Sequence, residues 1–330
     1  MGTGNKKLSD ILSGGKLILL GAIIGVVILF SLLNPNYFST ANLINILLAA
    51  SLTGLVAIGE AYLIIGSLCD LTPGSLVAFS GVLGATLAAK GIPFGAVILI
   101  TLTVGAAVGL FNAFMINEIK LEAFIATLVS QAIFRGLAYI ICSGKPVSIK
   151  NQSYIALGQA RIIGIPVSVW LMIILMVIFG FILAKTKFGR SIYAVGGNKA
   201  AARLAGLNPK RINYVMFLML GLLCALGGIV FSSRMHSGQP AANINLEFDA
   251  ITAVVLGGVA FSGGVGDMAG VALGILLLQA FNTGLTMVNV PAFWQYVARG
   301  GLLLIALTSD FIRKRNRERA LLEAGKKALR

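Results

Sequence analysis

Long stretches without a single Asp, Glu, Lys or Arg are the feature that most limits how this chain can fold. One helical crossing of a lipid bilayer needs about 20 predominantly apolar residues. Only 11% of the 330 residues are charged, whereas soluble domains carry about 25% charged residues. The sequence therefore predicts an all-α polytopic membrane protein. The charge-free stretches are Leu17–Gly59, Leu71–Ala89, Gly91–Asn117, Ile162–Ala184, Ile212–Ser233 and Met268–Ala298.

Breaks at Pro, Asn and Gly divide the apolar sequence into about ten predicted transmembrane helices. The third and the eighth are shorter than a full crossing. Glycine pairs spaced by four residues, which let helix backbones approach closely, occur at Gly21/Gly25, Gly105/Gly109 and Gly270/Gly274. The predicted helices are 17–33, 43–65, 74–89, 94–116, 123–142, 162–184, 212–233, 250–260, 268–287 and 293–309.

The basic residues predict the orientation of these helices. With both termini in the cytoplasm, nineteen Lys and Arg fall on the cytoplasmic side and five on the other side, as the positive-inside rule requires. The net charge of +15 is thus explained by topology, and no nucleic acid is expected as a partner. We expect a cytoplasmic N-terminal segment (1–16), a transmembrane domain (17–310) and a basic cytoplasmic tail (311–330). The first helix is expected to be an uncleaved anchor.

The sequence lacks the usual patterns of catalytic and cofactor sites. Its one histidine, His236, has no HExxH motif around it, and its three cysteines show no CxxC spacing. No glycine–lysine pair is followed by Ser or Thr, so there is no P-loop. We therefore expect no enzyme, metal or cofactor on this chain. If ATP drives the protein, ATP and Mg²⁺ bind to a separate ATPase.

The predicted cytoplasmic loop 185–211 encodes a short helix of its own. Asn198 suits an N-cap, the following residues are rich in alanine, and Gly206 suits a left-handed helix end. A helix of about two turns is too short to be stable in isolation. Its small apolar residues favour docking into a groove of another protein; the alternative is a solvated basic loop that is kept inside by its charge.

The same loop resembles the cytoplasmic coupling loop of ribose-type sugar ABC transporter permeases, which are related to the branched-chain amino acid permeases. The resemblance implies that 198–206 lies in a cleft of the ATPase subunit and transmits its closure to the membrane. The matching residues, which are the predicted coupling site, are Gly196, Gly197, Asn198, Ala201, Ala202, Arg203, Leu204 and Gly206.

Two further blocks support the resemblance. Asp70–Ser75 is similar to the family's Asp-Leu-Ser-Val-Gly-Ser element, and Phe248–Gly266 is similar to its Gly-Gly-Thr-Ser-Leu-x-Gly-Gly stretch. Shorter matches follow at 281–285 and 293–295, so the likeness extends from about residue 40 to 310. It implies two permease subunits, as a homodimer or heterodimer, two ATPase subunits and a periplasmic solute-binding protein.

The translocation path is expected where polar or glycine-rich sequence interrupts the apolar stretches, around 66–75 and 257–267. Broken backbone at membrane depth is tolerated only where protein or water satisfies it. Glu60, Arg135 and Arg299 lie within predicted helices, where they are either functional or structural; Asp70 is alternatively a cap for the helix that starts near Pro73. The candidate path residues are Asn45, Glu60, Asp70, Ser75, Phe261, Ser262 and Asn282.

These observations lead to one main hypothesis and two alternatives. The main hypothesis is the permease subunit of an ABC importer for a monosaccharide or related polyol, in the bacterial inner membrane. The first alternative is the same architecture with another solute, such as a branched-chain amino acid or a purine nucleoside. The second is an ion-coupled secondary transporter that uses Glu60 or Asp70. A purely structural scaffold would leave the capped 198–206 helix without a purpose.

Overall fold

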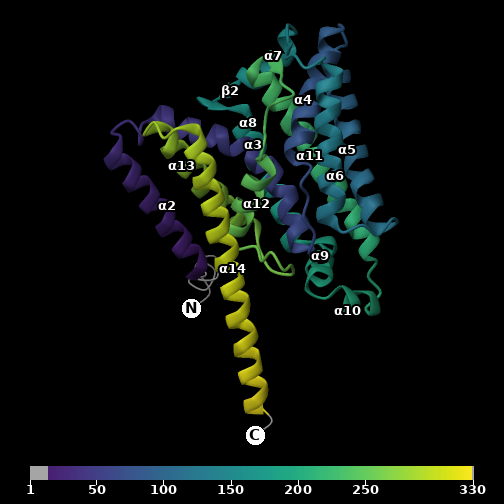
Figure 1. Ribbon diagram of the computed structural model, residues 1–330, viewed down its shortest axis with the longest axis vertical. Helices are drawn as coiled ribbons and strands as arrows, with labels where there is room; N and C mark the ends of the chain where they lie inside the picture. Colours follow the sequence, from purple (N-terminus) through teal and green to yellow (C-terminus); the bar gives the residue numbers. More distant parts are fainter. Residues whose placement is uncertain (1–13, 329–330) are drawn as a thin grey trace, which may run out of the picture.

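The computed structural model describes residues 14–328, and the chain is almost entirely helical (Figure 1). Seven of the described helices are long and apolar enough to cross a membrane, which confirms the predicted all-α polytopic membrane protein. They are α2 (Gly14–Leu33), α3 (Thr40–Ile65), α5 (Phe94–Asn117), α6 (Ala123–Ile141), α8 (Val167–Lys185), α11 (Pro209–Met235) and α13 (Met268–Met287).

The other helices differ in length and position. The short apolar helices α4 (Pro73–Ala89) and α12 (Leu246–Leu256) have 17 and 11 residues. The long helix α14 (Ala292–Ala328) has 37 residues. The remaining helices are α7 (Gln152–Gln159), α9 (Lys187–Gly197) and α10 (Lys199–Leu204).

Four two-residue strands form two small antiparallel pairs in the loops. In the first, β1 (Val147–Ser148) pairs with β4 (Ser237–Gly238), so that Val147 faces Gly238. In the second, β2 (Arg161–Ile162) pairs with β3 (Ile165–Pro166). This hairpin explains why the helix predicted from residue 162 begins at Val167.

Two other predicted helix boundaries were wrong. The helix predicted at 250–260 ends at Leu256, because Gly257 and Gly258 follow and Gly258 takes a φ of +90°. The helix predicted to end at residue 309 continues to Ala328. Its extension is rich in Arg, Lys, Glu, Leu and Ala, which favour helix, and neither Pro nor Gly occurs between residues 310 and 324.

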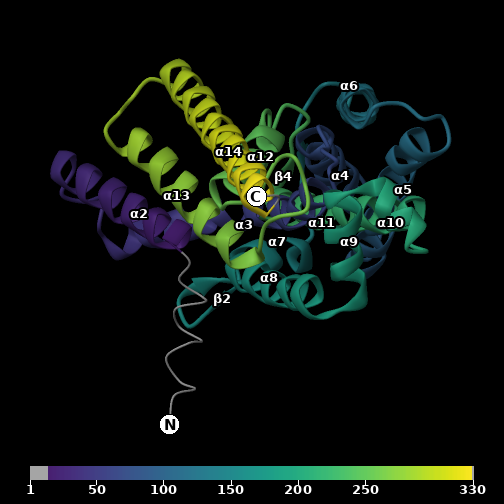
Figure 2. The ribbon, with the colours of Figure 1, turned by 90° about the horizontal axis from the view of Figure 1, so that it is seen from below.

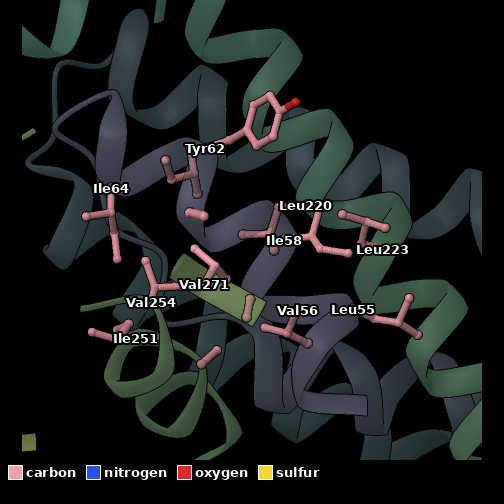
Figure 3. Close-up of a cluster of buried hydrophobic side chains, with 14 of the residues drawn as sticks. Leu55, Val56, Ile58, Tyr62, Ile64, Leu220, Leu223, Ile251, Val254 and Val271 are labelled. Atoms are coloured by element: carbon pink, nitrogen blue, oxygen red, sulfur yellow. The ribbon is translucent and has the colours of Figure 1, made fainter. Parts of the chain in front are cut away.

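Helix α3 forms the centre of the bundle. Every residue from Ala50 to Ile65 is buried, and the helix packs against α11, α13, α8 and α12 (Figure 2). Figure 3 shows how its side chains, including Ile58 and Tyr62, meet Leu220 of α11 and Val254 of α12. Other helices expose large apolar side chains on their outer faces, as lipid contact requires.

Glycines allow the closest contacts between helices. A Cβ at Gly221 of α11 would overlap the carbonyl oxygen of Gly105 of α5, and one at Gly109 would overlap that of Phe217. A Cβ at Gly274 of α13 would overlap the carbonyl oxygen of Ala253 of α12. Two of the three predicted glycine pairs thus lie at helix contacts. The third pair, Gly21/Gly25, has open space beside it.

We expect Gly221→Val to loosen the contact between α5 and α11. Added atoms at a close-packed site cost about 1–3 kcal/mol or more, so the apparent melting temperature of the purified protein in detergent should fall by several degrees. Gly25→Val is the matched control, because no atom lies within 4 Å of the added Cβ. Equal melting temperatures for the two variants would contradict the packing described here.

Candidate functional site: the coupling loop and its junction

The short helix predicted within the loop 185–211 is present, and its two ends have the predicted geometry. Asn198 ends α9 and caps α10, since its side-chain oxygen accepts hydrogen bonds from the amides of Ala200 and Ala201 at 3.1 and 2.9 Å. Gly206 has a φ of +82°. The amide of Leu207 donates to the carbonyl of Ala202 at 3.0 Å, which completes a Schellman motif.

Helix α9, which sequence reasoning missed, precedes this coupling helix. Thr186 caps it by accepting from the amide of Gly189 at 3.1 Å. Ile192, Val195 and Gly196 are buried on its inner side. The missed signal was the amphipathic spacing of these apolar residues in a segment that also contains three glycines.

The surface of α10 combines one buried contact with an exposed apolar residue. Ala202 is buried, whereas Leu204 is 92% exposed, and Ala201 and Arg203 are exposed beside it. A solvent-facing leucine on a capped two-turn helix is a typical anchor for a groove on a partner. Gly197 is also exposed.

Three chain segments that are distant in sequence meet beside α9, and we call this contact region the junction: residues 65–67, 193–197 and 257–267. Gly196 lies so close to the end of α3 that a Cβ would overlap the carbonyl oxygen of Ile65. That carbonyl accepts from the amide of Gly264 at 2.8 Å. The Ser67 hydroxyl lies 2.8 Å from the carbonyl oxygen of Gly196 and 3.0 Å from that of Ser262.

Further bonds hold the 257–267 loop on its other sides. The Tyr193 hydroxyl donates to the carbonyl of Gly266 at 2.7 Å, and burial raises the pKa of Tyr193, so the group stays a donor. The amide of Phe261 donates to Asp310 of α14 at 3.0 Å. Lys16 of α2 forms an ion pair with Asp267 at 2.9 Å. The loop thus contacts α2, α3, α9 and α14.

A buried polar network holds the broken segment between α3 and α4. The amide of Asp70 donates to the Glu60 carboxylate at 3.0 Å, and the amide of Thr72 donates to Asp70 at 2.6 Å. The side-chain amide of Asn112 donates to Asp70 at 3.2 Å and to the Thr72 hydroxyl at 2.9 Å. Ser130 donates in turn to Asn112. All five residues are at most 3% exposed.

Asp70 does not cap α4, so that alternative was wrong in its detail. The N-cap position is Thr72, whose side chain makes no capping bond, and Asp70 instead accepts from the backbone amide of Thr72 itself. The hydroxyl of Ser75 donates a hydrogen bond to the carbonyl of Thr72 at 2.8 Å. Asp70 therefore shapes the turn that leads into α4.

The start of α12 lies beside the start of α4. Glu247, in the first turn of α12, accepts from Gln131 of α6 at 2.7 Å, and a Cβ at Gly74 would overlap its other carboxylate oxygen. Arg135 of α6 donates to the carbonyls of Pro240 and Ala242 at 2.7 Å each, which fixes the non-helical segment before α12. Acidic groups beside two helix N-termini are electrostatically favourable.

An open polar cavity of about 360 Å³ lies between α3, α13 and the first turns of α14. It is lined by Asn42, Asn45, Gln279, Asn282, Thr286 and Arg299, among others. Asn282 is only 6% exposed, yet neither of its amide atoms has a hydrogen-bond partner. Arg299 also lines a neighbouring cavity of about 290 Å³ and approaches Asp249 at 3.5 Å.

The candidate path residues fall into three places. Asn45 and Asn282 line the polar cavity between α3, α13 and α14, which is called the outer cavity below. Phe261 and Ser262 line a cavity of about 470 Å³ at the junction. The other three, Glu60, Asp70 and Ser75, are buried in the polar network.

Sequence reasoning missed Asn112 as a member of the buried network, and it missed the neighbouring pair of Gln131 and Glu247. Amide side chains within apolar helices were the available signal, because they usually hydrogen-bond across helices. Among the residues that the structure describes, no group of three or more His, Cys, Asp or Glu side chains is placed to hold a metal.

A multi-pass helical bundle with two short inner helices and a capped short helix on one loop has the features of a transporter permease. Residues 42–307 match the family described as "Branched-chain amino acid transport system / permease component", and the chain belongs to this family. Its members are transporter subunits rather than enzymes, and this chain is a multi-pass protein of the bacterial inner membrane.

Several curated relatives align with most of this chain. The ribose import permease protein RbsC of Haemophilus influenzae is 34% identical over 88% of this chain and 91% of its own length. The L-arabinose transport system permease protein AraH of Escherichia coli is 39% identical over 84% of each chain. RbsC of Bacillus subtilis is 36% identical over 88% of this chain and 92% of its own. No solved structure matches the chain.

We expect Asn112→Ala to destabilise the protein, because it leaves the Oδ2 atom of Asp70 and the hydroxyl of Ser130 without a buried partner. An unsatisfied buried polar group costs about 1–3 kcal/mol. The measurement is the apparent melting temperature in detergent. Asn45→Ala is the control, since the Asn45 side chain is exposed. A melting temperature for Asn112→Ala equal to that of Asn45→Ala would refute this role.

Proposed function

We propose that this chain is the membrane-spanning permease subunit of a bacterial ABC importer for a monosaccharide or related polyol. The observation that carries the proposal is the capped α10 with its exposed Leu204, joined through Asn198 to α9, which packs against the rest of the junction. The choice of a sugar as the transported solute is supported by the relatives that are named as ribose and L-arabinose permeases.

The proposed topology has ten crossings, with both termini in the cytoplasm. Helices α4 and α12 are too short to cross alone, so each completes a crossing together with the non-helical segment that precedes it. The ion pair between Lys16 and Asp267 brings the start of α2 to the junction, and Figure 1 shows α9, α10 and the far end of α14 at this same end. The basic tail 311–330 then contacts anionic lipid.

In this proposal the coupling site divides into a docking part and a transmitting part. Ala201, Arg203 and Leu204 face the ATPase, whereas Asn198 and Gly206 fix the ends of the docking helix. Ala202 is buried in the hydrophobic core and so anchors the docking helix against the rest of this protein. Gly196 allows the close contact between α9 and the other two segments of the junction, and Gly197 lies exposed beside it.

The proposed path runs past the outer cavity and leaves near the junction. A neutral sugar needs hydrogen-bonding groups rather than a fixed ion, and Asn45 and Asn282 offer amides in the outer cavity. Phe261 and Ser262 lie at the cytoplasmic end. Glu60, Asp70 and Ser75 contribute by holding the segment before α4 in place.

The proposed partners follow from the same architecture. An ATPase subunit binds ATP and Mg²⁺ and docks on α10. A periplasmic solute-binding protein docks on the outer loops 143–161 and 234–249 and selects the sugar. A second permease copy, identical or related, completes the central path.

We expect Gly206→Pro to abolish ATPase binding while the protein still inserts into the membrane. Proline fixes φ near −65°, which is incompatible with the φ of +82° at Gly206. The measurement is gentle purification followed by mass spectrometry for a P-loop ATPase. Gly91→Pro is the matched control, because Gly91 has a φ of +81° in another turn, where a Cβ would meet no atom within 4 Å.

A second variant tests the docking surface without changing the backbone. Leu204→Asp should release the ATPase, whereas Ile163→Asp, at a residue of similar exposure on another loop, should retain it. Retention of the ATPase by both Gly206→Pro and Leu204→Asp would count against the assignment. If the chain alone accumulates solute under an ion gradient without ATP, and Glu60→Gln abolishes this uptake, the secondary-transporter alternative is correct.

We expect Asn282→Leu to slow sugar uptake severalfold while ATP hydrolysis stimulated by the binding protein continues. The substitution keeps the side-chain size but removes the amide oxygen and nitrogen of Asn282 from the outer cavity. Uptake of radiolabelled ribose or arabinose into proteoliposomes is the measurement. Asn36→Leu, in the turn between α2 and α3, is the control. Unchanged uptake in Asn282→Leu would remove this cavity from the path.

A further inference from the structure

Two hydroxyl groups tie α9 to the 257–267 loop, and neither belongs to the predicted coupling site or path. Tyr193 donates from the middle of α9 to Gly266, at one end of the loop, at 2.7 Å. Ser67 lies between the carbonyls of Gly196 and Ser262, at 2.8 and 3.0 Å. A hydroxyl carries one proton, so Ser67 donates to only one of these carbonyls at a time.

The backbone of Ser67 adds a second observation. Its φ is +61°, in the left-handed region that a residue with a side chain rarely adopts and that glycine adopts freely. Strained residues of this kind cluster at functional sites, where the surrounding structure holds them. Here the side chain that causes the strain makes the contacts with two other segments.

The far side of the loop faces the proposed cytoplasmic exit. Phe261 is 44% exposed and lines the cavity of about 470 Å³ together with Leu307 and Phe311 of α14. At its start the loop continues α12, which is pressed against α13, because a Cβ at Gly257 would come within 2.6 Å of the carbonyl oxygen of Gly270. A displacement of the loop therefore moves both the exit and α12.

We propose that Tyr193 and Ser67 are positioning residues that transmit the movement of α9 to the 257–267 loop and so open the cytoplasmic end of the path. The inference rests on the proposed function, since the ATPase supplies the movement. Tyr193 keeps the loop attached to α9. As the separation of α9 and the loop changes, the Ser67 hydroxyl switches its hydrogen bond between the carbonyl of Gly196 in α9 and that of Ser262 in the loop.

The test uses the complete transporter in proteoliposomes, with its ATPase and binding protein, and measures ribose or arabinose taken up per ATP hydrolysed. Tyr193→Phe should lower this ratio about fivefold, the factor that corresponds to one hydrogen bond of typical net strength. ATP hydrolysis stimulated by the binding protein should persist. Tyr37→Phe is the matched control, because Tyr37 donates to the carbonyl of Ala280 at 2.8 Å, away from the junction.

Substitutions of Ser67 separate the hydroxyl from the strained backbone. Ser67→Ala and Ser67→Gly should lower the ratio of uptake to ATP hydrolysis equally, while Ser67→Gly should melt at a higher temperature than Ser67→Ala. Ser191→Ala is the control, since the Ser191 hydroxyl bonds only within α9, to Lys187 at 2.9 Å. A wild-type ratio in both Ser67 variants overturns the role of this hydroxyl.

Amide hydrogen exchange provides a readout that does not depend on transport. Residues 260–266 should exchange faster in Tyr193→Phe than in Tyr37→Phe. The inference is overturned if the two variants have equal exchange rates at residues 260–266 and equal ratios of uptake to ATP hydrolysis. In that case, ATP-driven uptake by the wild-type transporter still leaves the proposed function intact. Absence of ATP-driven uptake by the wild-type transporter overturns both.

Discussion

The hydrogen-bonding requirement of the backbone inside a membrane is the constraint on which the rest of this structure depends. Lipid offers no partner for a free amide, and each unsatisfied group costs several kcal/mol. Helices α4 and α12 both begin inside the bundle, after segments that are not helical. Side chains therefore supply partners for the backbone there. Glu60 of α3 accepts from the amide of Asp70, Asp70 accepts from the amide of Thr72, and Arg135 of α6 donates to the carbonyls of Pro240 and Ala242.

This requirement gives the buried charges a structural explanation. An ion site for a secondary transporter would need an accessible carboxylate, whereas Glu60 is fully buried and accepts from a backbone amide. The open polar surface lies elsewhere, in the outer cavity and at the junction. The central network thus positions the two short helices.

Local signals predicted much of this arrangement. Charge-free stretches located the helices, and Asn198 and Gly206 marked the ends of α10, because capping depends on neighbours within a few residues. The partners of Asp70 and the meeting of Ser67 with Gly196 and Ser262 depend on contacts between segments up to 195 residues apart. Sequence patterns over a few residues do not predict contacts between such distant segments, and so the junction could not be predicted from the sequence.

The glycine contact between α5 and α11 also determines which parts of the molecule move together. With Gly105, Gly109 and Gly221 in backbone contact, the two helices have almost no room to slide or rotate against each other, since packed surfaces shift in discrete steps. Four residues separate the end of α10 from the start of α11. Any displacement that α10 passes to α11 through this short link is therefore shared by α5, because the two helices move as one rigid unit.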